Sequence, residues 1–183
     1  VEVLDMGTAA CCAINPTLDI TNASCFNGSN GQLTVTDIYA TSFSIDGTNY
    51  QASNVFNNLS AGNYTLYLSL SAECADTIPF TITEPDSIVI NITKDSVNCF
   101  STCDGSIQIS VSGGTPPYSF INNASAPQTS PIFSGLCAGT QFIQVTDSSG
   151  CQNSILDSIQ EPIDLAIQID STSDETCYSS NGI

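Results

Sequence analysis

An internal repeat of about 75 residues is the feature that most constrains this chain. Landmarks of the first unit recur in the second with nearly constant offsets: Cys25 to Cys99 is 74 positions, whereas Cys74 to Cys151 and Pro85 to Pro162 are both 77. A third copy opens at Cys177-Tyr178. We therefore predict four segments: the truncated and irregular end of a preceding repeat (1–24), module one (25–98), module two (99–176) and the start of a following repeat (177–183). We expect the chain to be a piece of a longer polypeptide.

Apolar residues alternate with polar ones inside each unit. Ile107, Ile109 and Val111 are spaced by two, as are other β-branched and aromatic residues, and Gly- or Pro-rich turns separate these runs. Such alternation is typical of half-buried strands, and no segment carries the apolar stripe of a helix. Six or seven short strands in about 75 residues predict an all-β fold of tandem immunoglobulin-like antiparallel β-sandwich repeats.

The charge composition excludes several functions. The chain has 18 acidic residues, one Lys or Arg (Lys94), no His and a net charge of −17. Without imidazole or clustered cations, the common catalytic groups and nucleic-acid contacts are missing, so we predict no enzyme and no nucleic-acid partner. No stretch approaches the roughly 18 apolar residues of a membrane span, so we expect no membrane insertion in this segment.

Nine cysteines predict a disulfide framework. Cys103 and Cys137 are replaced together by Ser29 and Ser60 in the first unit, which indicates that they are partners. The cysteines shared by both units predict two further bonds, Cys25 with Cys74 and Cys99 with Cys151. The partners of Cys11, Cys12 and Cys177 are left open. Zinc is the rival interpretation, but there is no C-x-x-C spacing, and disulfides place the protein outside the cytoplasm.

The second unit resembles the SprB repeat of large Bacteroidota surface adhesins, including the mobile adhesins of gliding bacteria. The resemblance lies in Cys99-Phe-Ser-Thr-Cys103-Asp-Gly, Gly113-Gly-Thr-Pro-Pro-Tyr118, Gly135-Leu-Cys-Ala-Gly139, Val145-Thr-Asp-Ser-Ser-Gly-Cys151 and Glu161-Pro162. The first unit shares the frame but has Asp37-Ile-Tyr-Ala40 in place of the Gly-Gly-Thr-Pro-Pro turn. This resemblance implies type IX secretion and a location on the bacterial cell surface, exterior to the outer membrane.

Two ligand hypotheses accompany this reading, with solvated turns and core packing as the simpler alternatives. Asp104, Asp147 and Asp157 are weak candidates for Ca²⁺, the one cofactor we consider, because carboxylates on an acidic chain favour a hard cation. Tyr118 and Phe120, two positions apart, are candidates for an aromatic sugar-binding face or for a core-facing pair.

Bacteroidota attach O-glycans at Asp followed by Ser or Thr and then by a small or aliphatic residue or Thr. Asx turns at strand ends are the structural alternative. Five such triplets make their hydroxyl residue a candidate for glycosylation: Thr77, Ser87, Ser96, Ser158 and Ser171.

We expect a non-enzymatic stalk segment of a large secreted adhesin, whose partners are the neighbouring repeats and whose external surface or glycan ligand is unknown. The first alternative is a lectin-like or Ca²⁺-dependent binding module. The second is a secreted hydrolase that uses paired carboxylates, although no spacing singles out a pair.

Overall fold

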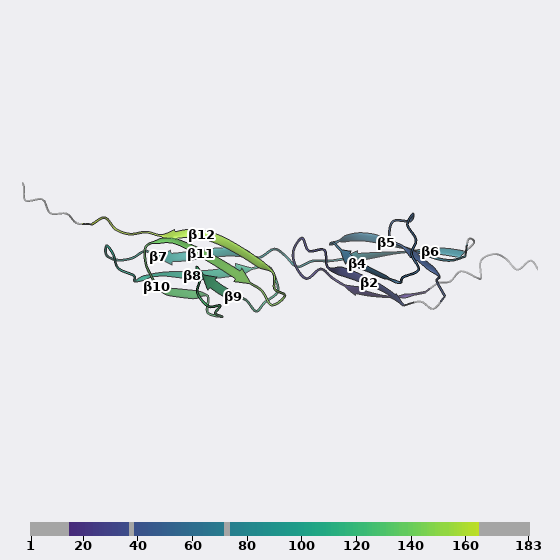
Figure 1. Cartoon of the computed structure of the whole chain (residues 1–183), viewed down its shortest axis with the longest axis horizontal. Helices are drawn as coiled ribbons and strands as arrows, with labels where there is room; N and C mark the ends of the chain where they lie inside the picture. Colours follow the sequence, from purple (N-terminus) through teal and green to yellow (C-terminus); the bar gives the residue numbers. More distant parts are fainter. Residues whose placement is uncertain (1–14, 37–38, 72–73, 165–183) are drawn as a thin grey trace, which may run out of the picture.

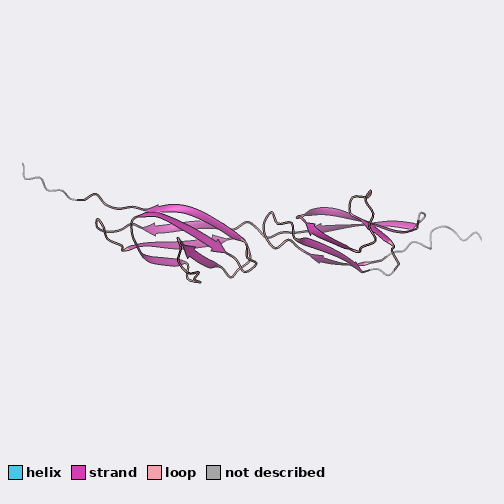
Figure 2. Cartoon of the chain, in the orientation of Figure 1, coloured by secondary structure: helices cyan, strands magenta, loops and turns pink. Residues whose placement is uncertain are grey.

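A computed structural model describes residues 15–36, 39–71 and 74–164 of the 183-residue chain. The described part forms two elongated β-sandwiches joined end to end (Figure 1), and its regular elements are all strands (Figure 2). Within these residues, no helix is long and apolar enough to cross a membrane. The predicted all-β architecture is confirmed.

The first sandwich, module 1, contains six strands in two three-stranded antiparallel sheets, ordered β1-β2-β4 and β3-β5-β6. Consecutive strands are divided between the sheets as in an immunoglobulin domain that lacks one edge strand. The strands are β1 (Thr17–Thr21), β2 (Gly31–Thr36), β3 (Ser42–Ser44), β4 (Val55–Leu59), β5 (Gly62–Ser71) and β6 (Cys74–Ile82).

The second sandwich, module 2, repeats this topology with sheets ordered β7-β8-β10 and β9-β11-β12. Each strand of module 1 thus has its counterpart six strands later in the chain, so that β1 corresponds to β7. The strands are β7 (Val89–Asp95), β8 (Gly105–Ser112), β9 (Ser119–Asn122), β10 (Ile132–Leu136), β11 (Gly139–Thr146) and β12 (Gln152–Ile159).

The module boundaries differ from the prediction by one strand. β1, assigned from sequence to the preceding repeat within 1–24, pairs antiparallel with β2 of module 1. β7, assigned to the 25–98 segment, pairs with β8 of module 2, so the predicted 99–176 module lacks its first strand. Each module therefore begins one strand before its Cys-Phe landmark, and the linker between them lies at residues 83–88.

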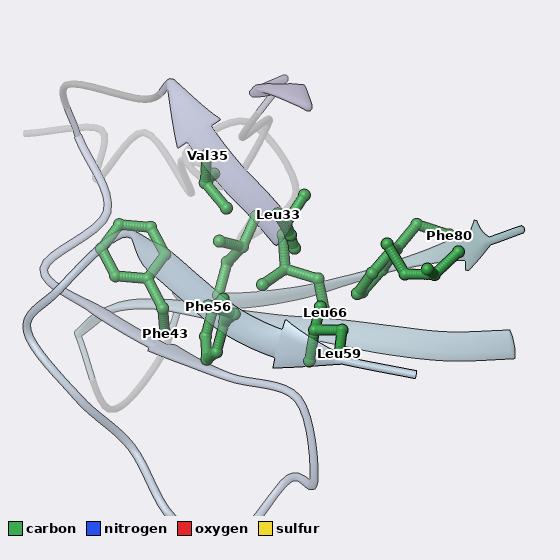
Figure 3. Packing of buried hydrophobic residues seen from close by; sticks show 9 residues of the cluster. Leu33, Val35, Phe43, Phe56, Leu59, Leu66 and Phe80 are labelled. Atoms are coloured by element: carbon green, nitrogen blue, oxygen red, sulfur yellow. The ribbon is translucent and has the colours of Figure 1, made fainter. Parts of the chain in front are cut away.

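Each core lies between the two sheets of its module. In module 1, Leu33 and Val35 of β2 and Leu66 and Leu68 of β5 are fully buried, and the inward phase of the alternation places them in one cluster. Figure 3 shows Leu33, Val35 and Leu66 in this cluster. Leu70 shares that phase but is exposed, because β5 pairs with β3 only up to Ser69 and then runs past the sandwich.

Candidate functional site: the junction between the two modules

A disulfide joins the two modules. Cys25, which follows β1 of module 1, is bonded to Cys151, which directly precedes β12 of module 2, with an S–S distance of 2.02 Å and a Cα–Cα distance of 5.6 Å. The bonded residues are 126 positions apart in sequence. We call this bond the staple, because together with the linker it gives the junction two covalent connections.

Two predicted disulfides, Cys25 with Cys74 and Cys99 with Cys151, are wrong, because Cys25 and Cys151 are bonded to each other instead. Cys74 begins β6, whose other end at Ile82 leads into the linker beside Cys25. A nine-residue strand is about 30 Å long, whereas a disulfide needs Cα atoms within about 7 Å. The same argument separates Cys99, after β7, from Cys151, because β12 runs the length of module 2 between the two ends. Cys99 is a free, exposed thiol.

The segment that carries Cys25 is held against the linker. We call residues 24–30 and their counterparts 98–104 the opening loops. Gly28 N–H donates to the Cys25 carbonyl (2.9 Å), which closes a tight turn, and Asn27 N–H donates to the Glu84 carboxylate (2.6 Å). Ala23 N–H donates to the Thr83 carbonyl (3.0 Å). The opening loop and the exit of module 1 are therefore fixed side by side, with Cys25 facing module 2.

The segment that carries Cys151, residues 147–151, is organised by one buried carboxylate. We call it the closing loop. Asp147 is 6% exposed, and its Oδ1 accepts hydrogen bonds from the backbone N–H groups of Ser149 and Cys151, both at 2.9 Å. Its Oδ2 accepts a third from Thr115 N–H (2.8 Å). Three backbone donors satisfy this acceptor-only group, and the resulting turn presents the Cys151 sulfur to module 1.

The linker is also pinned to module 2 by the Gly-Gly turn. Gly114 N–H donates to the Asp86 carbonyl (2.8 Å). Gly113 has a φ of 75° and lies so close to the linker that an added Cβ would sit 2.0 Å from the Ser87 carbonyl oxygen. A side chain at position 113 would therefore push the linker off the module and strain the turn.

The two modules and the linker enclose a cleft of about 500 Å³ at the junction. Module 1 contributes the staple cysteine and the half-exposed Phe26 ring, the linker contributes 85–88, and module 2 contributes the turn glycine and the closing loop. The lining is built from loops whose hydrogen bonds run within the junction itself, which supports a role in coupling modules.

The third predicted disulfide, Cys103 with Cys137, is present in module 2. Cys103 lies just before β8 and Cys137 just after β10, and these antiparallel strands pair Gly105 with Leu136 at that end. The joint replacement of both cysteines in the first unit therefore reflected true partners. Cys11, Cys12 and Cys177 lie outside the described residues.

The three carboxylates proposed for Ca²⁺ lie apart and have separate partners. Asp104, in the second opening loop, accepts hydrogen bonds from the Asn98 side chain and backbone and from Thr102, and these bonds lower the pKa of its carboxyl. Asp157, in β12, accepts a hydrogen bond from Lys94 Nζ (2.5 Å), which lowers its pKa. Asp147 serves the closing loop at the other end of the module. Among the described residues no three acidic, Cys or His side chains gather as a metal site.

The aromatic pair points into the core rather than outward. Phe120 is 5% exposed within the core cluster of module 2, and Tyr118 packs against that cluster while its hydroxyl donates to the Gly113 carbonyl (2.6 Å). The core-facing alternative is thus the one that the structure supports, and the pair offers no sugar-stacking face.

The candidate glycosylation hydroxyls fall into two groups. Thr77 and Ser96 are exposed, whereas Ser87 and Ser158 are half-buried. Ser87 lines the junction cleft, and Ser158 Oγ accepts a hydrogen bond from the Gln160 amide (3.0 Å). Ser171 lies outside the described residues.

Sequence reasoning missed Glu84 and Gly113 as site residues. Glu84 directly precedes the repeated Pro85, and its recurrence as Glu161 beside Pro162 was the available signal. Gly113 appeared as a generic turn residue, and its contact with the linker depends on the fold.

Comparison with known proteins identifies one repeat family. The SprB repeat matches residues 91–126, which span most of β7 and all of β8 and β9. Among solved structures, the chain is similar to the C-terminal 282-residue fragment of intimin, solved in complex with the intimin-binding domain of the translocated intimin receptor. The identity is 12%, the TM-score is 0.44, and the match covers 79% of this chain and 64% of that one, so the chain spans less than two thirds of that fragment's length. No curated protein matches the chain.

Proposed function

Because residues 91–126 match the SprB repeat, we propose that the chain is a stalk segment of a large secreted surface adhesin, in which stapled β-sandwich modules form a stiff rod. The observation that carries the proposal is the Cys25–Cys151 bond between consecutive modules. A hinge with one covalent connection swivels freely, whereas a peptide linker and a disulfide at separate points restrict both bending and twisting. A stalk that holds a binding tip away from a cell needs this stiffness.

Further features of the junction support a rod over a pair of loosely tethered domains. The linker has no free length, since Glu84 holds one side of it and Gly114 N–H binds the other at Asp86. The modules lie end to end along one axis (Figure 1). The net charge of −17 adds repulsion between neighbours, screened beyond roughly 8 Å at physiological salt.

The proposal includes a location and a set of family properties. Disulfides persist in oxidising compartments, and the SprB repeat is a unit of surface adhesins, which together support an extracellular site on the bacterial surface. On the basis of the similarity to the SprB repeat, we also propose export by type IX secretion, a part in gliding motility, assembly into a filament and O-glycosylation. We also propose that the segment is non-enzymatic, on the ground that the chain has no His and a single Lys.

Small-angle X-ray scattering of the full chain tests the rod directly. We expect a pair-distance distribution with the long tail of an end-to-end pair, and a maximum dimension that does not change with salt. The variant Cys25→Ser/Cys151→Ser should broaden that distribution, because the junction then bends about the linker alone. The variant Cys103→Ser/Cys137→Ser is the matched control, since it removes a disulfide within module 2 and should leave the distribution unchanged.

Two results would contradict the stalk. One is a near-spherical particle for the native chain, and the other is no difference between the staple variant and the native chain. The binding-module alternative is addressed separately by a glycan array and by thermal melting with and without Ca²⁺. Saturable glycan binding, or a metal-dependent rise in melting temperature, would favour that alternative over a passive stalk.

A further inference from the structure

The far end of module 2 carries a second opening loop built like the first. Thr102 N–H donates to the Cys99 carbonyl (3.2 Å), as Gly28 N–H does to Cys25. Ser101 N–H donates to the Glu161 carboxylate (2.6 Å), and Ser101 has a φ of 61° against 55° for its counterpart Asn27. The loop that positions the staple cysteine in module 1 is therefore reproduced around Cys99.

The hollow beside Cys99 corresponds to one half of the junction cleft. It has a volume of about 360 Å³ and is lined by 98–100 and 162–164. Apart from Asn98, these are the counterparts of module 1 and linker residues that line the first junction. In that junction, the closing loop, Gly114 and the start of β12 supply the other half of the lining. Phe100 is 51% exposed, close to the 49% of Phe26, so both rings leave a face open at the rim.

The sequence beyond Pro162 repeats the sequence beyond Pro85. Ile167 and Ile169 recur at the spacing of Ile90 and Ile92, and Cys177-Tyr178 then follows as Cys99-Phe100 does. The corresponding stretch beyond Pro85 forms the first strand of module 2, β7, and its opening loop, 98–104. The chain after Pro162 thus begins as module 2 begins. A module that continues it would bring its closing loop to Cys99 if the second junction has the geometry of the first.

We propose that Cys99 forms a second staple, bonded to the closing-loop cysteine of the module that follows Pro162. The general rule is that the opening-loop cysteine of each module bonds the closing-loop cysteine of the next one. This inference rests on the proposed stalk and specifies how its junctions are joined. Cys99 is more than a lone thiol, because its counterpart Cys25 makes this bond within the same molecule.

Formation of the bond is a two-electron oxidation, and we assign the oxidant to the class of disulfide donors. The Cys99 thiolate attacks a donor disulfide and releases one donor thiolate. The closing-loop thiolate then attacks the Cys99 sulfur, forms the Cys99–Cys bond and releases the second donor thiolate. Two cysteine thiols and one donor disulfide thus give one protein disulfide and two donor thiols.

An in-frame duplication of residues 86–162 within the full chain tests the rule. The protein runs from 1 to 162 and then from 86 to 183, so that Pro162 precedes Asp86 as Pro85 does natively. Cys99 of the copy is changed to Ser, which leaves one Cys99 to follow. The protein is refolded with oxidised and reduced glutathione, treated with a maleimide and digested with pepsin, since a single Lys gives trypsin almost no sites.

In the native 183-residue chain, the Cys99 peptide should carry the maleimide. In the duplicated protein we expect loss of that label and a peptide that joins Cys99 to Cys151. Cys151→Ser in the copy should restore labelling of Cys99. Cys151→Ser in the original module should instead expose Cys25 while Cys99 stays bonded, which distinguishes the second staple from a bond within module 2.

The Cys25–Cys151 and Cys103–Cys137 peptides report that the duplicated protein has folded. If they form and Cys99 is still labelled, the rule is wrong while the first junction, and the stalk built on it, stands. Disulfide-linked dimers through Cys99 would also overturn the proposal and point to a second molecule as the partner. Failure of the stalk itself would appear in the scattering of the native chain, independently of Cys99.

Discussion

Removal of the staple by Cys25→Ser/Cys151→Ser should lower the free energy of unfolding of both modules. When module 1 unfolds beside a folded module 2, the bond closes a loop from Cys25 to Pro85, a separation of 60 positions. When module 2 unfolds alone, the loop runs from Pro85 to Cys151, a separation of 66. The chain-entropy model gives about 4 kcal/mol for either loop. This is a large part of the roughly 5–15 kcal/mol of stability that a domain has.

Urea titration with hydrogen exchange read by mass spectrometry resolves the modules separately. The matched control, Cys103→Ser/Cys137→Ser, opens a loop of 34 positions within module 2. It should cost module 2 about 4 kcal/mol and leave module 1 unchanged. The reasoning is refuted if module 1 is as stable in the staple variant as it is in the native chain. That result would mean that no bond joins module 1 to module 2.

Three other outcomes are expected. Asp147→Ala should destabilise module 2 by about 3 kcal/mol in urea titration and slow formation of the staple on refolding, because three backbone donors lose their acceptor, whereas Asp147→Asn should cost less. Acidification below about pH 4 should destabilise module 1. Hydrogen bonds to Asp46, first from Asn49 N–H, hold the pKa of its carboxyl below the unfolded value, so this stability is present above the unfolded pKa and lost as the pH falls; Asp46→Asn should flatten the melting curve against pH. Mass spectrometry of protein from the native host should find O-glycans at the exposed Thr77 and Ser96 before the half-buried Ser87, and an unmodified mass would remove the proposal.

The fold could be predicted from the sequence because period-two alternation reports burial directly. Ile107 and Ile109 lie inward as their spacing predicts. The repeat gave the period of the modules but not their starting point, since any landmark recurs at the same interval wherever the unit begins. The Cys-Phe landmark was the most visible one, yet β1 and β7 precede it and pair inside the module.

Of the three predicted disulfides, the sequence predicted one correctly and two wrongly. Cys103 and Cys137 could be paired because a substitution removed both together. For Cys25 and Cys74, presence in the same unit was taken as proximity. The alternation of Ile78, Phe80 and Ile82 nevertheless indicates a strand that separates Cys74 from the linker. Which end of a sandwich a loop occupies, and which neighbour it faces, depends on three-dimensional topology.

Two strands of module 2 connect its two ends. β7 runs from the linker to the second opening loop, and β12 runs from the closing loop to Pro162. Asn153 Nδ2 binds the Ile88 carbonyl (2.6 Å) near one end, and Lys94 pairs with Asp157 near the other. With a staple at each junction, pulling force would enter at Asp86 and Cys151 and leave at Cys99 and Pro162.

Tension would therefore travel along β7 and β12 in parallel, over 13 and 11 positions, while 100–150 stays in a loop that carries none. An unstapled module of 77 positions would extend by up to about 250 Å when it unfolds under force. A doubly stapled one would lengthen only slightly. A cut by a protease within the linker would likewise leave the two modules joined through the sulfur bridge.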